Sequence, residues 1–174
     1  MEWWQELAVQ STAIALGALV GIPTGLYVAR RLREKEITER RVQLYDSILA
    51  NLKKNLSLLI QIEQGPEGLV DSRIIYYNLE LDFWSTVAPE VSSLKNPGLE
   101  TEINYAYYEL HHIARKIDVL FESAFLSGNP AFDSNPVWAE LKKKTIVHAK
   151  VREQDVSALV QKIEDAREKL VNDP

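Results

Sequence analysis

A long uncharged and mostly apolar segment lies near the start of the chain, and hydrophobic residues recur at helical intervals in the rest of it. From Leu7 to Ala29 no residue is charged. This length matches the roughly 20 helical residues that cross a hydrocarbon core of about 30 Å. A buried soluble helix is the alternative interpretation. The absence of charge over the whole segment favours a membrane-spanning helix, with the lipid bilayer as its first partner.

The residues on either side of this segment predict its orientation. Acidic residues but no Lys or Arg precede it, whereas RRLREK follows it. The positive-inside rule therefore places the N-terminus outside the cell (inner) membrane, and a cleavable signal peptide would carry its basic residues first. We predict a single-pass anchor over residues 1–30 and a cytoplasmic domain over residues 31–174. The residues typical of a membrane interface are Trp3, Trp4, Tyr27, Arg30, Arg31 and Arg33.

The cytoplasmic part has the hydrophobic spacing of a helix bundle. No helix breaker occurs between Ala29 and Gln64, so the membrane helix is expected to continue directly into a long cytoplasmic helix. A heptad seam with alternating steps of four and three predicts a further helix. Its members are Leu99, Ile103, Ala106, Leu110, Ile113, Ile117, Leu120 and Ala124. We expect an all-α fold in which the anchor leads into an up-down bundle of about four helices.

Asparagine and proline residues mark where two of these helices begin. The Asn-Pro pairs at 96–97 and 135–136 provide an N-cap residue and a first-turn proline. Another helix is predicted to begin at Asp71 or Ser72 and to end at APEV. The last helix is expected to bend or break at REQD, residues 152–155.

Small residues recur at every fourth position of the predicted membrane segment. They form a ridge made of Ala13, Gly17, Gly21, Gly25 and Ala29. In lipid, helices associate through close contact, and small residues let their backbones approach. Pro23 removes a helical N–H and predicts a kink. The ridge favours a homo-oligomer; a different membrane or cytoplasmic protein is the alternative partner.

A ring of such helices would enclose a pore. Three polar residues near the outer end of the segment would then line it: Gln10, Ser11 and Thr12. A dimer or a tight bundle without a lumen is the alternative, because association does not require a channel.

Candidate chemistry in the cytoplasmic part is sparse. Glu109 and His112 form one Glu-x-x-His, whereas a carboxylate-bridged di-metal bundle needs this pair twice, with further inward carboxylates. Both residues also lie at the border of the seam, so no metal ligands are assigned. Serine-nucleophile and phosphate-loop motifs are missing. We therefore predict no catalytic residues and no cofactor, and we do not expect an enzyme.

The charge balance narrows the range of partners. The net charge of −5 over 174 residues argues against general nucleic-acid binding, and the lack of cysteine excludes disulfides and Cys-type zinc sites. A basic run in the last helix would suit anionic lipid, RNA or an acidic partner, although a solvated helix face is the simpler interpretation. This run comprises Lys142, Lys143, Lys144, His148, Lys150 and Arg152.

The layout resembles that of small single-pass membrane proteins with cytoplasmic helical domains, such as CRISPR-associated membrane proteins that form oligomeric pores. The anchor at residues 7–29, RRLREK and the following bundle carry this resemblance. The Arg-His pair of HEPN-type ribonucleases is missing, because no Arg stands four to six residues before any of the three His residues. The resemblance favours the pore interpretation, without a shared motif that would establish a role in antiviral defence. The alternatives are an accessory subunit of a larger membrane complex and a carboxylate-bridged metal enzyme.

Overall fold

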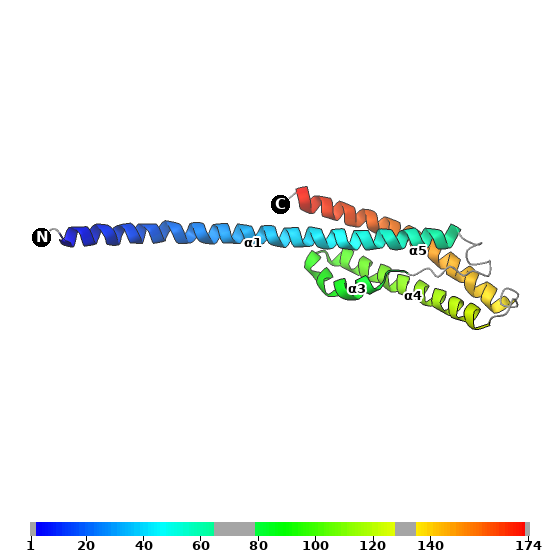
Figure 1. Cartoon of the computed structure of the whole chain (residues 1–174). Helices are drawn as coiled ribbons and strands as arrows, with labels where there is room; N and C mark the ends of the chain where they lie inside the picture. Colours follow the sequence, from blue (N-terminus) through cyan, green and yellow to red (C-terminus); the bar gives the residue numbers. More distant parts are fainter. Residues whose placement is uncertain (1–2, 65–78, 128–134, 173–174) are drawn as a thin grey trace. The chain divides into compact units, whose positions relative to one another are not determined.

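The part of the chain that the structure describes is helical. A computed structural model describes residues 3–64, 79–127 and 135–172, with side chains described outside residues 4–20, 63–64 and 124–127. Within these ranges there are four α-helices and no strands (Figure 1). The helices are α1 (Trp3–Gln64), α3 (Asp82–Val87), α4 (Pro97–Ser127) and α5 (Pro136–Asn172), with a 3-10 helix, η1 (Ala88–Leu94), between α3 and α4. The prediction of an all-α fold is confirmed.

The chain divides into two compact units, residues 1–40 and Arg41–Asp173, and α1 contributes to both. The helix continues through Pro23 and through the stretch from Ala29 to Gln64, so the predicted continuity is confirmed. Among the side chains that the structure describes, no helix is both long and apolar enough to cross a membrane. Most of the predicted span falls on residues 4–20, whose side chains lie outside that description.

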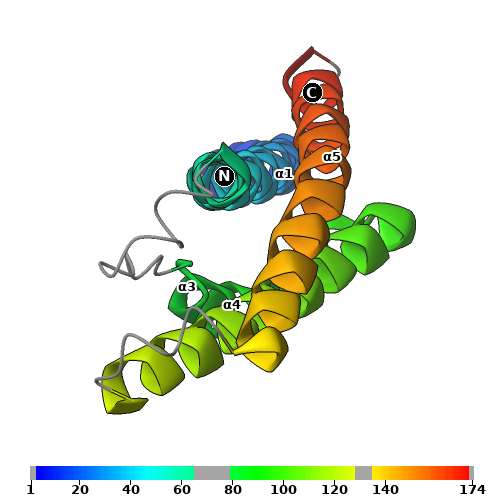
Figure 2. The same ribbon diagram turned by 90° about the vertical axis from the view of Figure 1, so that its right-hand side faces the viewer.

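The second unit is organised around a core formed by α1, α4 and α5. Figures 1 and 2 show that α4 and α5 run in opposite directions and cross each other. The α1 residues Leu44, Ile48, Leu52 and Leu59 are buried in this core. On α4 every seam residue from Leu99 to Leu120 is buried; Ala124 lies outside the described side chains.

The two Asn-Pro pairs begin helices as predicted. Asn96 Oδ1 accepts a hydrogen bond from the N–H of Leu99 at 3.2 Å, and α4 starts at Pro97. Asn135 Oδ1 accepts from the N–H of Val137 at 3.0 Å. In both cases a side-chain oxygen satisfies a backbone donor of the first turn, which has no partner within the helix.

One predicted helix has the wrong length, and a break predicted in the last helix does not occur. Residues 79–81 are not helical, and the helix expected to end at APEV is the six-residue α3 followed by η1. The positions proposed for its start lie outside the described residues. The last helix does not break at residues 152–155 either, since α5 is continuous. Its sequence there has no Pro or Gly, and Val156 is buried in the core.

A buried polar network explains why residues 79–81 are not helical. The side chain of Asn55 pairs with both backbone groups of Glu80: the Glu80 N–H donates to Asn55 Oδ1 at 2.8 Å, and Asn55 Nδ2 donates to the Glu80 carbonyl at 3.3 Å. Asn51 Nδ2 donates to the same carbonyl at 3.1 Å. Side-chain amides thus replace the backbone partners that a helix would provide.

Tyr107 of α4 closes this network. Its hydroxyl donates to Asn51 Oδ1 at 2.7 Å, and its ring stacks on Trp84 with centroids 4.2 Å apart. Burial raises the pKa of Tyr107 well above its usual value. The hydroxyl therefore serves as a fixed hydrogen-bond donor that joins α4 to α1.

Candidate functional site

Three half-buried charged or titratable side chains meet between α4 and α5. Glu109 of α4 lies 2.7 Å from His148 Nε2 and 3.1 Å from Arg152 Nε, both on α5. The three side chains are 14%, 18% and 20% exposed, respectively. Arg152 also pairs with Asp155 and lies over the ring of Tyr105, 5.3 Å from its centroid. This cluster is more desolvated than the exposed ion pairs that join helices elsewhere in the bundle.

Lys116 determines which nitrogen of His148 carries the proton. Its ammonium group lies 2.8 Å from His148 Nδ1 and can only donate, so Nδ1 accepts. Nε2 then carries the hydrogen and donates it to Glu109. Arg152 Nε is 3.5 Å from the same nitrogen, which has no free lone pair in this tautomer, so Arg152 donates to Glu109 instead. The result is a chain of hydrogen bonds in which Lys116 donates to His148 and His148 donates to Glu109.

The surroundings of Glu109 keep it ionised. Desolvation by burial raises the pKa of this carboxyl, but the hydrogen bond from His148 and the charge of Arg152 outweigh it, and the pKa is lowered. Desolvation lowers the pKa of Arg152 while Glu109 and Asp155 raise it, and the net shift is upward. Both charges therefore persist at neutral pH.

Arg152 lines two shallow grooves between α4 and α5. One, of about 270 Å³, contains the paired charges Glu102, Glu109, Arg152, Asp155 and Lys162. The other, of about 440 Å³, is called here the basic groove. It is lined by Lys116, Glu140, Lys143, Lys144, Val147, His148, Val151 and Arg152.

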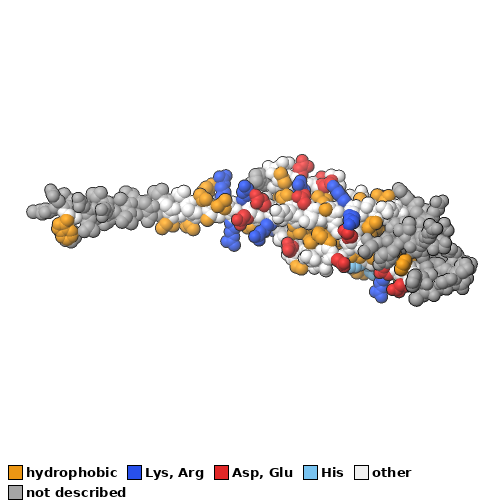
Figure 3. Space-filling view, in the orientation of Figure 1, with side chains coloured by type: hydrophobic (Ala, Val, Ile, Leu, Met, Phe, Trp, Pro, Cys, Tyr) orange, Lys and Arg blue, Asp and Glu red, His pale blue; other side chains and the backbone are white. Residues whose placement is uncertain are grey.

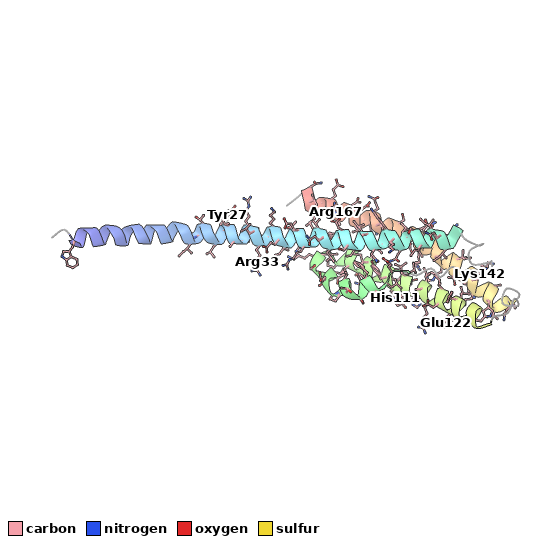
Figure 4. All side chains as sticks on the ribbon, in the orientation of Figure 1. Tyr27, Arg33, His111, Glu122, Lys142 and Arg167 are labelled. Carbon is pink, nitrogen blue, oxygen red and sulfur yellow. The ribbon has the colours of Figure 1, made fainter. Side chains whose placement is uncertain are left out.

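The two residues of the Glu-x-x-His motif, which is not assigned as a metal site, have different partners. His112 is exposed and lies edge-on against the ring of Tyr108, 4.5 Å from its centroid, whereas Glu109 contacts His148. Within the described ranges, no group of three or more His, Asp or Glu side chains is placed to hold a metal ion. The neighbouring His111 and Glu122 lie on α4, and Lys142 lies on α5 (Figure 4). The basic run thus has two parts: Lys143, Lys144, His148 and Arg152 line the basic groove, and Lys142 and Lys150 do not.

The first unit presents a different surface. From Gly21 to Ile37 every side chain is exposed. A methyl group added at Gly21 or Gly25 would meet no atom within 4 Å, so contacts inside this chain do not require glycine at either position. Figure 3 shows hydrophobic side chains along this part of α1 up to the first Lys and Arg side chains. Near them, Arg30 pairs with Glu34 at 3.0 Å.

The structure describes the side chains of only some of the other residues predicted at the membrane interface, the ridge and the pore. Tyr27 and Arg33 project from α1 in Figure 4, and the guanidinium of Arg31 lies 6.0 Å from the centroid of the Tyr27 ring. Trp3, Pro23 and Ala29 lie in the helix, with Trp3 and Ala29 exposed. The predicted residues whose side chains lie outside the description are Trp4, Gln10, Ser11, Thr12, Ala13 and Gly17.

Comparison of this chain with protein-family models, with curated proteins and with solved structures finds no match.

Proposed function

We propose that this protein is a non-enzymatic, membrane-anchored homo-oligomer. In this proposal α1 crosses the bilayer over Leu7–Ala29 and packs against copies of itself through the small-residue ridge. The bundle of residues 41–173 is then displayed on the cytoplasmic side as a scaffold.

The observation that carries this proposal is the distribution of exposed hydrophobic residues in the first unit. Ile22, Leu26, Tyr27, Val28 and Leu32 are each about half exposed or more. At about 100° per residue, these positions point to all sides of the helix. A helix that is hydrophobic all round belongs in a protein core or in a membrane. Since this chain buries none of these five side chains, the bilayer and neighbouring copies are the surroundings that fit.

The open positions at Gly21 and Gly25 support self-association within that bilayer. Glycine costs a helix roughly 1 kcal/mol relative to alanine, and no contact within the chain offsets this cost at either position. A partner helix that approaches closely along the ridge would provide the missing contact. The basic residues Arg30, Arg31 and Arg33 follow directly, where cytoplasmic headgroups would lie.

A pore is the more specific form of the same proposal. If the assembled helices enclose a lumen, Gln10, Ser11 and Thr12 line its outer part and Pro23 marks the expected kink. Ion conductance of the purified protein in a planar bilayer separates a pore from a closed scaffold.

The test is the mass of the full chain in mild detergent. We expect an oligomer that Gly21→Leu dissociates, because leucine fills the close approach between helices. The matched control is Val28→Leu, which enlarges an exposed residue of the same segment outside the ridge. A monomeric wild-type protein, or an oligomer that resists Gly21→Leu, would overturn the proposal. A stoichiometric foreign protein on uncrosslinked purification would instead make this chain an accessory subunit.

A further inference from the structure

We infer that the basic groove between α4 and α5 binds a phosphate-bearing ligand that also has an apolar or aromatic part. This inference is independent of the proposed oligomer, because it concerns side chains of the second unit only.

The first argument is the imbalance of charge in the groove. Lys116, Lys143, Lys144 and Arg152 line it, and among the described lining residues Glu140 is the one carboxylate. Two of these cations are already paired: Arg152 with Glu109 and Asp155, and Lys144 with Glu140 at 3.4 Å. The Lys144–Glu140 pair is more than half exposed on both sides, so it is weak and readily exchanged.

The second argument is the position of Lys116. Its ammonium lies 2.8 Å from a ring nitrogen of His148, and an imidazole offers no negative charge. A partly buried cation without a carboxylate partner favours an additional anion. Lys116 and Lys143 thus provide two ammonium groups without a carboxylate partner among the described residues. Lysine is a common phosphate ligand, and phosphate offers it several strong acceptor oxygens.

The third argument is the apolar wall. Val147 and Val151 line the same groove and are 54% and 47% exposed. They stand one helical turn apart on α5, so they form one surface. The groove volume of about 440 Å³ lies within the roughly 300–1,000 Å³ of small-molecule sites. A ligand with phosphate against the lysines and an apolar group against the valines matches both features.

A soluble nucleotide and an anionic phospholipid share this chemistry, and the experiment separates them. The first arm titrates the full chain in mild detergent with ADP in the absence of divalent metal. The second arm reconstitutes it in discs of phosphatidylcholine with phosphatidylglycerol, and counts by native mass spectrometry the phosphatidylglycerol molecules retained. Binding in either arm supports the inference and identifies the source.

The test variant is Lys116→Gln combined with Lys143→Gln. The amide introduced by Lys116→Gln would still be able to donate to His148, so folding should be kept, and circular dichroism with thermal unfolding checks this. We expect a loss of affinity of about tenfold or more per lysine removed, because each lysine would donate a charged hydrogen bond to the phosphate. The matched control, Lys169→Gln, removes one charge from the exposed last turn of α5, and this variant should bind the ligand as the wild type does.

Three outcomes would overturn the inference. They are the absence of binding in both arms, binding that the double variant leaves unchanged, and tighter binding of a glutamate-rich peptide than of ADP with the same lysine dependence. The last result would assign the groove to an acidic protein. None of them affects the detergent mass on which the proposed oligomer depends, so the two proposals fail separately.

Discussion

The two halves of α1 differ in how their hydrophobic residues are arranged. In the first half, Ile22, Tyr27 and Val28 are exposed and point to different sides of the helix, at least about 100° apart. In the second half, Leu44, Ile48, Leu52 and Leu59 are buried and fall within an arc of about 80°, at about 100° per residue. One continuous helix therefore has a part whose described hydrophobic side chains are exposed on all sides and an amphipathic part whose hydrophobic face is buried in the core.

Apolar composition alone therefore does not show whether a helix segment is packed in a protein core. The second half alternates its buried face with exposed Lys53, Lys54 and Ser57, as a helix at the edge of a water-soluble core does. The first half has no polar face between Gly21 and Ala29 except Thr24. The arrangement of polar residues thus distinguishes a core helix from one that needs an apolar environment.

Truncating a hydrophobic side chain should affect the stability of the bundle differently in the two halves of α1. We expect Leu52→Ala to lower the free energy of unfolding of the bundle by about 2–5 kcal/mol, because it leaves a cavity at a fully buried site. Leu26→Ala, at a residue 67% exposed, is the matched control and should change it by about 0.5 kcal/mol or less. Urea unfolding of the full chain in mild detergent, followed by circular dichroism, measures both. A similar loss for the two variants would show that α1 has no such division.

The second half of α1 also has buried polar residues whose hydrogen bonds can be tested. Asn55→Ala should lower the free energy of unfolding by about 1–3 kcal/mol, because it removes the acceptor of a partly buried hydrogen bond from the Glu80 N–H. Asn104→Ala is the control, since the Asn104 amide is exposed and bonds to the carbonyl of Glu100 in its own helix. If the two variants unfold alike, the network does not fix residues 79–81.

Most of the fold was predictable because its signals are local. An asparagine followed by proline satisfies the first turn of a helix wherever it occurs, and the seam of α4 needs only its own spacing. Residues 79–81 were mispredicted because Asn51 and Asn55, more than 20 residues earlier, determine their conformation. No local pattern reports a contact of that kind.

The charge cluster was missed for a related reason. The Glu109–His148 contact joins residues 39 positions apart and depends on how α4 and α5 are aligned. A partial signal existed, since each stands directly before a buried residue, Leu110 and Ala149. Border positions of two seams that pack together are candidates for such pairs. His112 fits a Glu-x-x-His motif by its spacing from Glu109, but its ring lies against Tyr108.

The charge cluster also makes stability depend on pH. The folded pKa of Glu109 lies below its unfolded value, so its contribution is present above the unfolded pKa, about 4.5, and is lost as pH falls through the folded pKa. At pH 7, Glu109→Gln should lower the free energy of unfolding by about 1–2 kcal/mol, as expected for a partly buried charged hydrogen bond. The difference from wild type should shrink as pH falls below about 4.5.

Glu122→Gln is the control for this experiment, because Glu122 is exposed on the same helix. Urea unfolding at a series of pH values from 7 to acid measures both variants. A Glu109→Gln effect that stays constant through the acid range would show that the interaction does not depend on the carboxylate charge.

The smallest expected effects on the free energy of unfolding come from exposed ion pairs. One such pair lies in each half of α1. Lys53 pairs with Glu164 of α5 at 2.6 Å, whereas Lys35 pairs with Glu39 of its own helix at 3.8 Å. Lys53→Gln should lower the free energy of unfolding of the bundle by about 0.2–1 kcal/mol, less at high salt, because the pair joins two helices in solvent. Lys35→Gln should leave it unchanged within error, since it breaks no contact with the core. Unfolding at low and at high salt tests both, and a larger effect at Lys35 would mean that the bundle depends on the first half of α1.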